Sequence, residues 1–187
     1  MNAEFKTSLA PITDENAAGE TKTIIETTKA QLGFAPNMYR TMANSEAYLS
    51  TYMHGYKAFR AGSGFSAQEQ EIVFLTISRE NGCDYCTAAH SMIADKVAKF
   101  EPGLLAAVRA EEPLADEKLQ ALSVFTSHLF QTRGLISNAE AAAFLAAGYS
   151  EQQILEIILA ISVKTLSNYS NHIFHTNIDA AFADYEL

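Results

Sequence analysis

The sequence predicts an all-α fold in a single domain, and three observations support this prediction. Apolar residues recur at spacings of three and four along most of the chain, and no segment alternates with the period of two that is typical of a β-strand. Capping-box sequences precede two of these segments. The chain has 187 residues, of which 48% are hydrophobic, so it is long enough for one well-buried core. We expect a single helical domain over residues 14–187, preceded by a flexible arm over residues 1–13.

The first part of the domain divides into four predicted helices, each with its own start signal. Thr13–Asp14 can cap the first, and Pro36, which fits only a first helical turn, separates it from the second. Ser45 can cap the third, and Ser66 forms a capping box with Glu69 at the start of the fourth. The predicted helices cover residues 14–32, 38–42, 45–60 and 66–79.

The third of these helices carries a stripe of aromatic and apolar side chains at helical spacing. We interpret the stripe as part of the core rather than as a cofactor pocket, because core packing is the usual role of such a pattern. Its members are Tyr48, Leu49, Tyr52, Met53, Tyr56 and Phe59.

Five more helices are predicted in the rest of the chain. One begins near Cys83 after the turn at Asn81–Gly82, and a short one lies between Pro102 and Pro113. A capping box over Ser137–Glu140 opens another, and the last begins at Ser150. They cover residues 83–100, 104–110, 116–133, 137–147 and 150 onward.

The charge balance excludes two classes of partner. The formal net charge is −9 and the isoelectric point is near 5.0, whereas nucleic acids and anionic membranes require clustered Lys and Arg. The N-terminal residues lack the basic and apolar segments of a secretory signal. We therefore expect a soluble, cytoplasmic protein, and in a reducing cytosol a pair of nearby cysteines indicates redox or catalytic chemistry.

Both cysteines of the chain lie in one Cys-x-x-Cys motif at a predicted helix start. Residues three apart on a helix are neighbours, so one sulfur of Cys83 and Cys86 can attack a substrate while the other resolves the product as a disulfide. His90 follows on the same helical face and can accept a thiol proton, and Glu71 on the preceding helix can orient that imidazole. Asp84 opposes thiolate formation by placing a negative charge beside the pair.

A weak internal repeat accompanies the motif. Residues of about 65–98, with their cysteine pair, resemble residues of about 149–180, in which Ser167 and Ser170 stand in place of Cys83 and Cys86. The sequence thus predicts a duplicated helical unit of which only the first copy retains its thiols.

The spacing of Glu71, Cys83, Cys86 and His90 resembles the signature of the alkylhydroperoxidase D (AhpD-like) proteins of the carboxymuconolactone decarboxylase superfamily. The sequence Gly-Phe-Ala-Pro-Asn at residues 33–37 and the segment at residues 171–175 are similar to the longer, peroxidase-related branch of that family. The resemblance therefore extends over most of the chain. It implies an AhpD-like helical fold with duplicated units, assembled as a dimer, trimer or hexamer.

The resemblance also implies a cysteine-based hydroperoxide reductase. Cys86 would attack the peroxide, Cys83 would resolve it as a disulfide, and His90 and Glu71 would relay protons. The partners would be a hydroperoxide substrate and an external dithiol or thiol protein as reductant, with no cofactor and no resident metal ion. Further supporting candidates are Tyr85, which stands where the best-known members have histidine, and Ser78, Asn81 and His172.

Several alternatives remain open from the residues themselves. The chain could be a thiol-disulfide exchange protein or a non-catalytic redox sensor. A zinc module is less favoured, because the motif with His90 supplies three ligands and the fourth would have to come from far away. A lactone decarboxylase is also less favoured, because the branch with that activity lacks the paired cysteines.

Overall fold

The computed structural model describes residues 2–187, and all regular structure within them is helical, which confirms the predicted fold class. The described residues form nine α-helices and one 3-10 helix, η1. Their bounds are α1 Gly19–Leu32, α2 Asn37–Met42, α3 Glu46–Gly62, α4 Ala67–Glu80, α5 Asp84–Lys96, α6 Pro102–Ala110, α7 Glu117–Gln131, α8 Asn138–Ala146, α9 Glu151–Phe174 and η1 Ala180–Tyr185.

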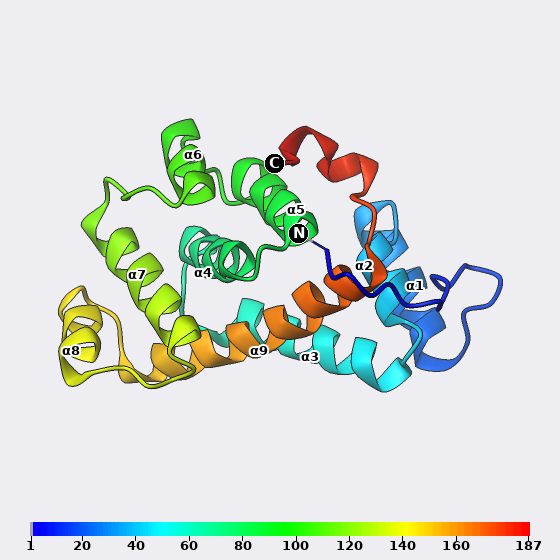
Figure 1. Ribbon diagram of the computed structural model, residues 1–187, viewed down its shortest axis with the longest axis horizontal. Helices are drawn as coiled ribbons and strands as arrows, with labels where there is room; N and C mark the ends of the chain where they lie inside the picture. The colour runs from blue at the N-terminus through cyan, green and yellow to red at the C-terminus, as the bar shows by residue number, and fades with distance from the viewer. Residues whose placement is uncertain (1) are drawn as a thin grey trace.

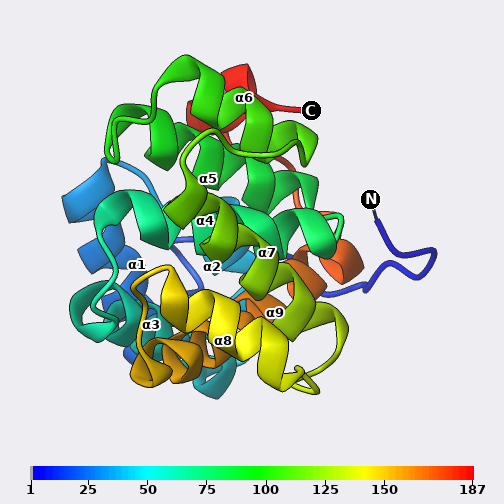
Figure 2. The same cartoon turned by 90° about the vertical axis from the view of Figure 1, so that its left-hand side faces the viewer.

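Helix α9 runs along the length of the molecule, with α3 beside it, as Figure 1 shows. Helix α4 lies in the middle and packs against α5, α6, α7 and α9, while α7 and α8 occupy one end and α1 and α2 the other. Figure 2 views the molecule from the end that carries α7 and α8. Although α9 has 24 residues, neither it nor any other helix in the described part of the chain is apolar enough along its length to cross a bilayer.

The buried apolar side chains form two clusters that share α9. The first core lies among α4, α6, α7, α8 and the N-terminal half of α9, and it includes Phe74, Leu122, Phe125, Phe144 and Ile157. The second core lies among α1, α2, α3, α5 and the C-terminal half of α9. The two cysteines belong to the second core, and both side chains are almost fully buried.

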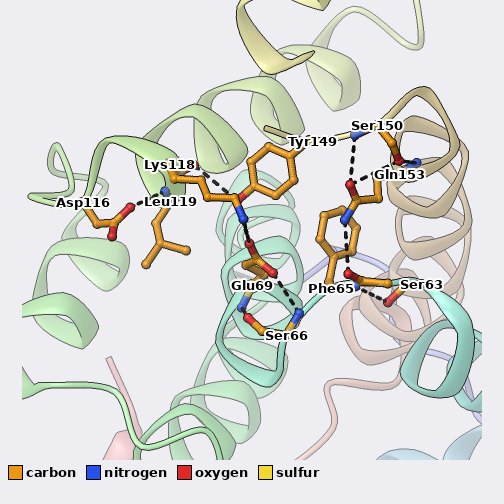
Figure 3. Close-up of polar contacts among 11 residues, drawn as sticks. Ser63, Phe65, Ser66, Glu69, Asp116, Lys118, Leu119, Tyr149, Ser150 and Gln153 are labelled. Atoms are coloured by element: carbon orange, nitrogen blue, oxygen red, sulfur yellow. Dashed lines mark hydrogen bonds and ion pairs between the residues drawn. The ribbon is translucent and has the colours of Figure 1, made fainter. Parts of the chain in front are cut away.

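The N-terminus of α4 is held in place by polar contacts at one end of the first core (Figure 3). The predicted capping box is present, because Ser66 accepts from the Glu69 backbone and the Glu69 carboxylate accepts from the Ser66 backbone. The same carboxylate lies 3.0 Å from Lys118 Nζ on α7 and accepts a hydrogen bond from the Tyr149 hydroxyl. These contacts fix the helix whose other end leads into the cysteine turn.

The close approach of α3 and α9 depends on one glycine. A Cβ atom at Gly55 would lie 2.8 Å from Val163 Cγ2, which is shorter than real Cβ contacts. The absence of a side chain at this position therefore allows the two helices to pack closely where α9 enters the second core.

The first helix begins later than the sequence predicts. It starts at Gly19 with Ala18 as N-cap, and not at Thr13–Asp14. The reason is that the Asp14 carboxylate forms ion pairs with Lys29 and with Arg40, and these contacts hold it away from a capping position. Residues 2–13 contain no helix. Ala3 and Thr7 donate backbone hydrogen bonds to the C-terminal end of α9, and Ile12 donates one to Arg40 on α2.

The two halves of the predicted repeat have different local structures. Helices α4 and α5 are separated by a turn in which Gly82 has a φ of 62°, a left-handed value that suits glycine. The equivalent residue of the second half is Leu166, and there α9 continues without a break. The duplication of the helical unit therefore stays a prediction from the sequence.

Candidate active site

The two cysteines lie at the N-terminus of α5, with Cys83 as the N-cap and Cys86 in the first turn. The turn is anchored by a 3.0 Å backbone hydrogen bond from Cys83 to the carbonyl of Ser78. The side chains are 1% and 2% exposed, and the two thiols are not bridged. The partial positive charge of a helix N-terminus favours a thiolate at this place.

Glu71 and His90 meet in the core, as the sequence predicts. His90 Nδ1 lies 2.8 Å from Glu71 Oε2, and the other carboxylate oxygen lies 2.5 Å from Arg60 Nη2 on α3. Burial raises the pKa of Glu71, but its contacts with His90 and Arg60 outweigh burial and lower it. The carboxylate is therefore ionised and fully buried within an ion pair.

His90 is neutral at physiological pH. Burial lowers the pKa of the imidazole, and the positive charge of Lys164 lowers it further, against the opposing influence of Glu71. Because the Glu71 carboxylate can only accept, the neutral ring carries its proton on Nδ1. The lone pair of Nε2 is therefore available to accept a proton.

Helix α9 presents a polar face to the cysteines. Its members are spaced by three, four and seven residues, so they share one side of the helix, and all are buried: Lys164, Ser167, Asn168 and Asn171.

These α9 side chains contact the cysteine turn directly. The Asn171 amide donates to Cys86 Sγ at 3.2 Å and to Cys83 Sγ at 3.7 Å. Asn81 in the turn donates to Asn168 at 2.9 Å. The Ser167 hydroxyl donates to backbone carbonyls of its own helix and lies close enough to Cys86 to lower the pKa of that thiol. Ser167, which stands in place of Cys83 in the predicted repeat, thus lies close to Cys86.

The two thiols are electrostatically different. Burial raises the pKa of Cys86, but a hydrogen bond from Cys83 and the positive charge of Lys164 outweigh burial, and the pKa lies well below the ordinary value. The pKa of Cys83 is raised, first by its hydrogen bond to Cys86 and then by burial. Cys86 is therefore the more acidic thiol of the pair, and Cys83 is the less acidic one.

The two cations of the site differ in their pairing. Among the ion pairs of residues 2–187, Arg60 is paired with Glu71, whereas Lys164 is paired with no carboxylate. Lys164 is 1% exposed, and its positive charge lowers the pKa of Cys86. A buried ammonium without any anion would be costly, so the geometry itself favours ionised Cys86.

Cys86 and His90 line a cavity of about 720 Å³ between α1, α2, α3 and α5. Exposed Leu32 and Val97 also line it and give it an apolar edge at the surface. The other lining side chains are mostly aromatic or apolar and include Phe34, Met38, Tyr39, Tyr52, Met53, Tyr56, Ala89, Met92 and Phe182. Half of the aromatic stripe of α3 therefore faces the thiol cavity, although Leu49 and Phe59 are fully buried in the two cores.

The Tyr85 hydroxyl is hydrogen-bonded to groups other than the thiols. Its hydroxyl donates to Asp179 Oδ2 at 2.5 Å and accepts from the backbone of Met38 at 3.3 Å. Burial and the Asp179 charge raise its pKa. Tyr85 thus links α5 to α2 and to the segment before η1, and its phenol is not placed to relay protons at the sulfurs.

The other supporting candidates lie around the cysteine turn. Ser78 donates to the backbone of Phe74 within its own helix, and Asn81 bridges the turn to α9. His172 lies on the Cys83 side of the pair, in a small polar pocket. Within residues 2–187, no group of three His, Cys, Asp or Glu side chains is arranged to hold a metal ion.

Sequence reasoning missed Lys164 and Asn171 as site residues. The signal that would identify them is the helical spacing of polar residues in an otherwise apolar segment, with a lysine on the same face. Arg60 was missed as well, because its partner Glu71 lies on a different helix.

Comparisons with known proteins agree with this architecture. Residues 46–127, which extend from the start of α3 into α7, match the model of the carboxymuconolactone decarboxylase family. No curated protein matches the chain.

Solved structures resemble the chain over nearly all of its length. A peroxidase-related protein from Ralstonia eutropha JMP134, described as an alkylhydroperoxidase AhpD core, has a TM-score of 0.79 and 18% identity, covering 93% of this chain and 96% of its own. One from Silicibacter sp. TM1040 has a TM-score of 0.77 and 20% identity over 96% and 97%. The debrominase Bmp8 in complex with 2,3,4-tribromopyrrole has a TM-score of 0.78 and 17% identity over 96% of both chains. The chain therefore has the AhpD-like fold, and its residues 46–127 match the carboxymuconolactone decarboxylase family.

Proposed function

We propose that this protein reduces organic hydroperoxides with the Cys83 and Cys86 pair, with Cys86 as the attacking sulfur. The observation that carries the proposal is the position of Cys86, whose pKa is lowered and which lies at a large apolar cavity beside Lys164 and His90. Thiolates, not thiols, are the nucleophiles in such reactions. The peroxidase-related names of two similar structures agree with this chemistry.

The proposed reaction has two steps. The Cys86 thiolate attacks the outer oxygen of the hydroperoxide, the O–O bond breaks, and the alkoxide takes a proton to leave as an alcohol. Cys86 becomes a sulfenic acid. The Cys83 thiol then attacks that sulfur, a disulfide forms, and the hydroxyl leaves with the Cys83 proton as water. Two electrons from an external dithiol or thiol protein restore the pair.

The surrounding side chains supply the proton transfers. Lys164 is a buried ammonium beside Cys86 and can stabilise the alkoxide as it leaves. His90 Nε2, with its tautomer set by Glu71, can take the proton of the Cys83 thiol or of the incoming hydroperoxide.

The cavity favours a bulky apolar substrate over hydrogen peroxide. A volume of about 720 Å³ lined mainly by aromatic and methionine side chains suits a drug-sized organic molecule. Hydrogen peroxide would leave most of that apolar surface wet. We therefore expect aryl or long alkyl hydroperoxides as substrates.

The test is consumption of cumene hydroperoxide by the dithiothreitol-reduced protein, with Cys86→Ser and Cys83→Ser variants alongside. We expect Cys86→Ser to lose all turnover. Cys83→Ser should consume about one equivalent of hydroperoxide and stop, because its sulfenic acid has no resolving thiol. Turnover of the Cys86→Ser variant at the wild-type rate would contradict the assignment of the attacking sulfur.

A second candidate function is reductive dehalogenation of halogenated aromatic compounds. It is favoured by the aromatic cavity that ends at Cys86 and by the similar fold of a debrominase bound to a tribromopyrrole. In this reaction the carbon–bromine bond is replaced by a carbon–hydrogen bond, bromide leaves, and the two thiols become a disulfide. Bromide release from 2,3,4-tribromopyrrole by the reduced protein, without hydroperoxide consumption, would favour this alternative.

We also propose that the protein works in the cytoplasm as a homo-oligomer. The apolar side chains Leu155, Ile158, Tyr169 and Ile173 are exposed along one face of α9, which a second copy would cover. Light scattering coupled to size-exclusion chromatography would give the number of chains, and a monomeric mass at micromolar concentration would contradict the proposal.

A further inference from the structure

The two sulfurs of the pair open onto different cavities. Cys86 lines the apolar cavity between α1, α2, α3 and α5, whereas Cys83 lines a separate pocket of about 200 Å³ near the end of α9. Of the lining residues, Tyr85 is the one that the two cavities share. A molecule that reaches one sulfur therefore approaches from a different side than a molecule that reaches the other.

The pocket at Cys83 is polar and has unmet hydrogen-bonding capacity. Within residues 2–187, three buried atoms of its lining have no hydrogen-bond partner: Asn171 Oδ1, His172 Nε2 and Thr176 Oγ1. Asn171 is 3% exposed and its amide already donates to the two sulfurs, so its oxygen is the free acceptor beside them. Buried polar atoms are normally paired, so this arrangement points to a polar ligand.

We propose that this polar pocket binds the reductant, a cysteinyl thiol with its flanking amide, and delivers its sulfur to Cys83 of the oxidised pair. The inference rests on the proposed function in one respect, that a Cys83–Cys86 disulfide forms during the cycle. Asn171 Oδ1 accepts from the amide N–H of the ligand, and the Thr176 hydroxyl binds its carbonyl or carboxylate. The volume has room for one such group, and its polarity excludes an apolar thiol.

The exchange reaction that follows is balanced in electrons and protons. The incoming thiol gives its proton to His172 Nε2, its sulfur bonds to Cys83, and the disulfide breaks with release of Cys86 as thiolate. A second thiol attacks the reductant's sulfur in the mixed disulfide, which releases Cys83 as a thiol and forms the oxidised reductant.

Two features of the site favour attack at Cys83 over Cys86. The thiol with the lower pKa is the better leaving group, and Lys164 and Asn171 stabilise Cys86 as a thiolate. His172 is suited to accept the thiol proton, because burial lowers its pKa and keeps the ring neutral.

The test measures the reductive half-reaction alone. The disulfide is formed with diamide, so that the measurement does not depend on hydroperoxide turnover, and the return of the two thiols in glutathione is followed by alkylation and mass spectrometry. Thr176→Val removes the hydroxyl at nearly constant volume, and Asn177→Trp fills the pocket from its exposed rim. Ala89→Trp fills the apolar cavity and is the matched control.

We expect Thr176→Val to slow reduction by glutathione about tenfold, the effect of one lost hydrogen bond of about 1.4 kcal/mol. Asn177→Trp should slow it at least as much, and Ala89→Trp should leave it within about twofold. Dithiothreitol, which has no amide, should be less sensitive to Thr176→Val than glutathione is. If the pocket variants slow reduction by thioredoxin but not reduction by glutathione, the cysteinyl group that the pocket binds belongs to a protein. Equal slowing by Ala89→Trp and Asn177→Trp, or no slowing by either pocket variant with any thiol, would overturn the proposal.

Discussion

The Glu71 carboxylate and the His90 imidazole lie 2.8 Å apart, with both side chains buried between α4 and α5. The contact fixes the ring as the tautomer with its proton on Nδ1, and it leaves Nε2 to accept a proton. Arg60 neutralises the carboxylate from the other side at 2.5 Å. The contact between Glu71 and His90, which the spacing of Glu71, Cys83, Cys86 and His90 predicts, is therefore present, and an arginine is added to it. A proton relay through this pair stays a prediction.

Replacement of Glu71 by glutamine tests this relay. The amide of Glu71→Gln can donate to Nδ1, which shifts the ring proton to Nε2 and removes the acceptor. We expect hydroperoxide turnover to fall by about 10²-fold or more, the usual worth of a positioned base. The measurement is turnover against pH, and the matched control is Glu69→Gln, which neutralises a buried carboxylate of the same helix far from the thiols. Identical profiles for the two variants would remove Glu71 from the mechanism.

Lys164 is expected to set the acidity of Cys86. In Lys164→Met the positive charge that favours the thiolate is gone, so the pKa of Cys86 should rise. The pH at which iodoacetamide alkylation reaches half its maximal rate should move upward by the same amount. Cys83 does not interfere, because its pKa is raised.

Lys57→Met is the matched control for Lys164→Met. Lys57 also lines the apolar cavity, but it is exposed. Solvent screens its charge, so the alkylation profile of this variant should stay close to that of the wild type. Equal shifts in both variants would mean that the field of the whole cavity, and not the buried ammonium, controls the thiol.

The cavity gives a prediction about substrate size. Ala89→Trp adds an indole beside His90 in the space that we assign to the organic group of the substrate. We expect kcat/KM for cumene hydroperoxide to fall by about 10–200-fold, while that for hydrogen peroxide changes much less. Both substrates are measured with the same variant, so misfolding would lower both values alike and would be recognised. An equal loss for both would indicate damage to the thiols and not a lost binding site.

The local features of the fold could be predicted from the sequence, because they depend on residues close together in the chain. The capping boxes predicted at Ser66 and Ser137 are both present, and Ser45 caps α3 as predicted. The last helix begins after Ser150 as predicted, and there the structure adds a third capping box. Asp14 is the exception. Its carboxylate is taken by two cations from other segments, one of which is 26 residues away in the chain, and no local pattern encodes this competition.

The candidate site could be predicted only where its members share one helical unit. Their spacing in the sequence was enough to identify four members of the site, because these residues lie in α4, in α5 or at the N-cap of α5: Glu71, Cys83, Cys86 and His90. Asn171 and Lys164 reach the thiols only because α9 packs on α5. In the sequence they lie about 80 residues from the cysteines. Their roles depend on which face of α9 is turned inward. That orientation is set in part by the close contact between Gly55 and Val163. No sequence motif predicts this contact.

Tyr85 is expected to contribute to stability and not to proton transfer, although it stands between the cysteines in sequence. Its hydroxyl bridges Asp179 and the Met38 backbone in the core. Tyr85→Phe leaves both groups without this partner, and we expect it to lower the free energy of unfolding by about 1–3 kcal/mol. The control Tyr169→Phe changes a phenol that is half exposed and should cost little. Denaturant unfolding measures both variants, and the rate of Cys86 alkylation at neutral pH should be the same in both. A stable Tyr85→Phe protein with slow alkylation would instead show that the phenol acts on the thiols.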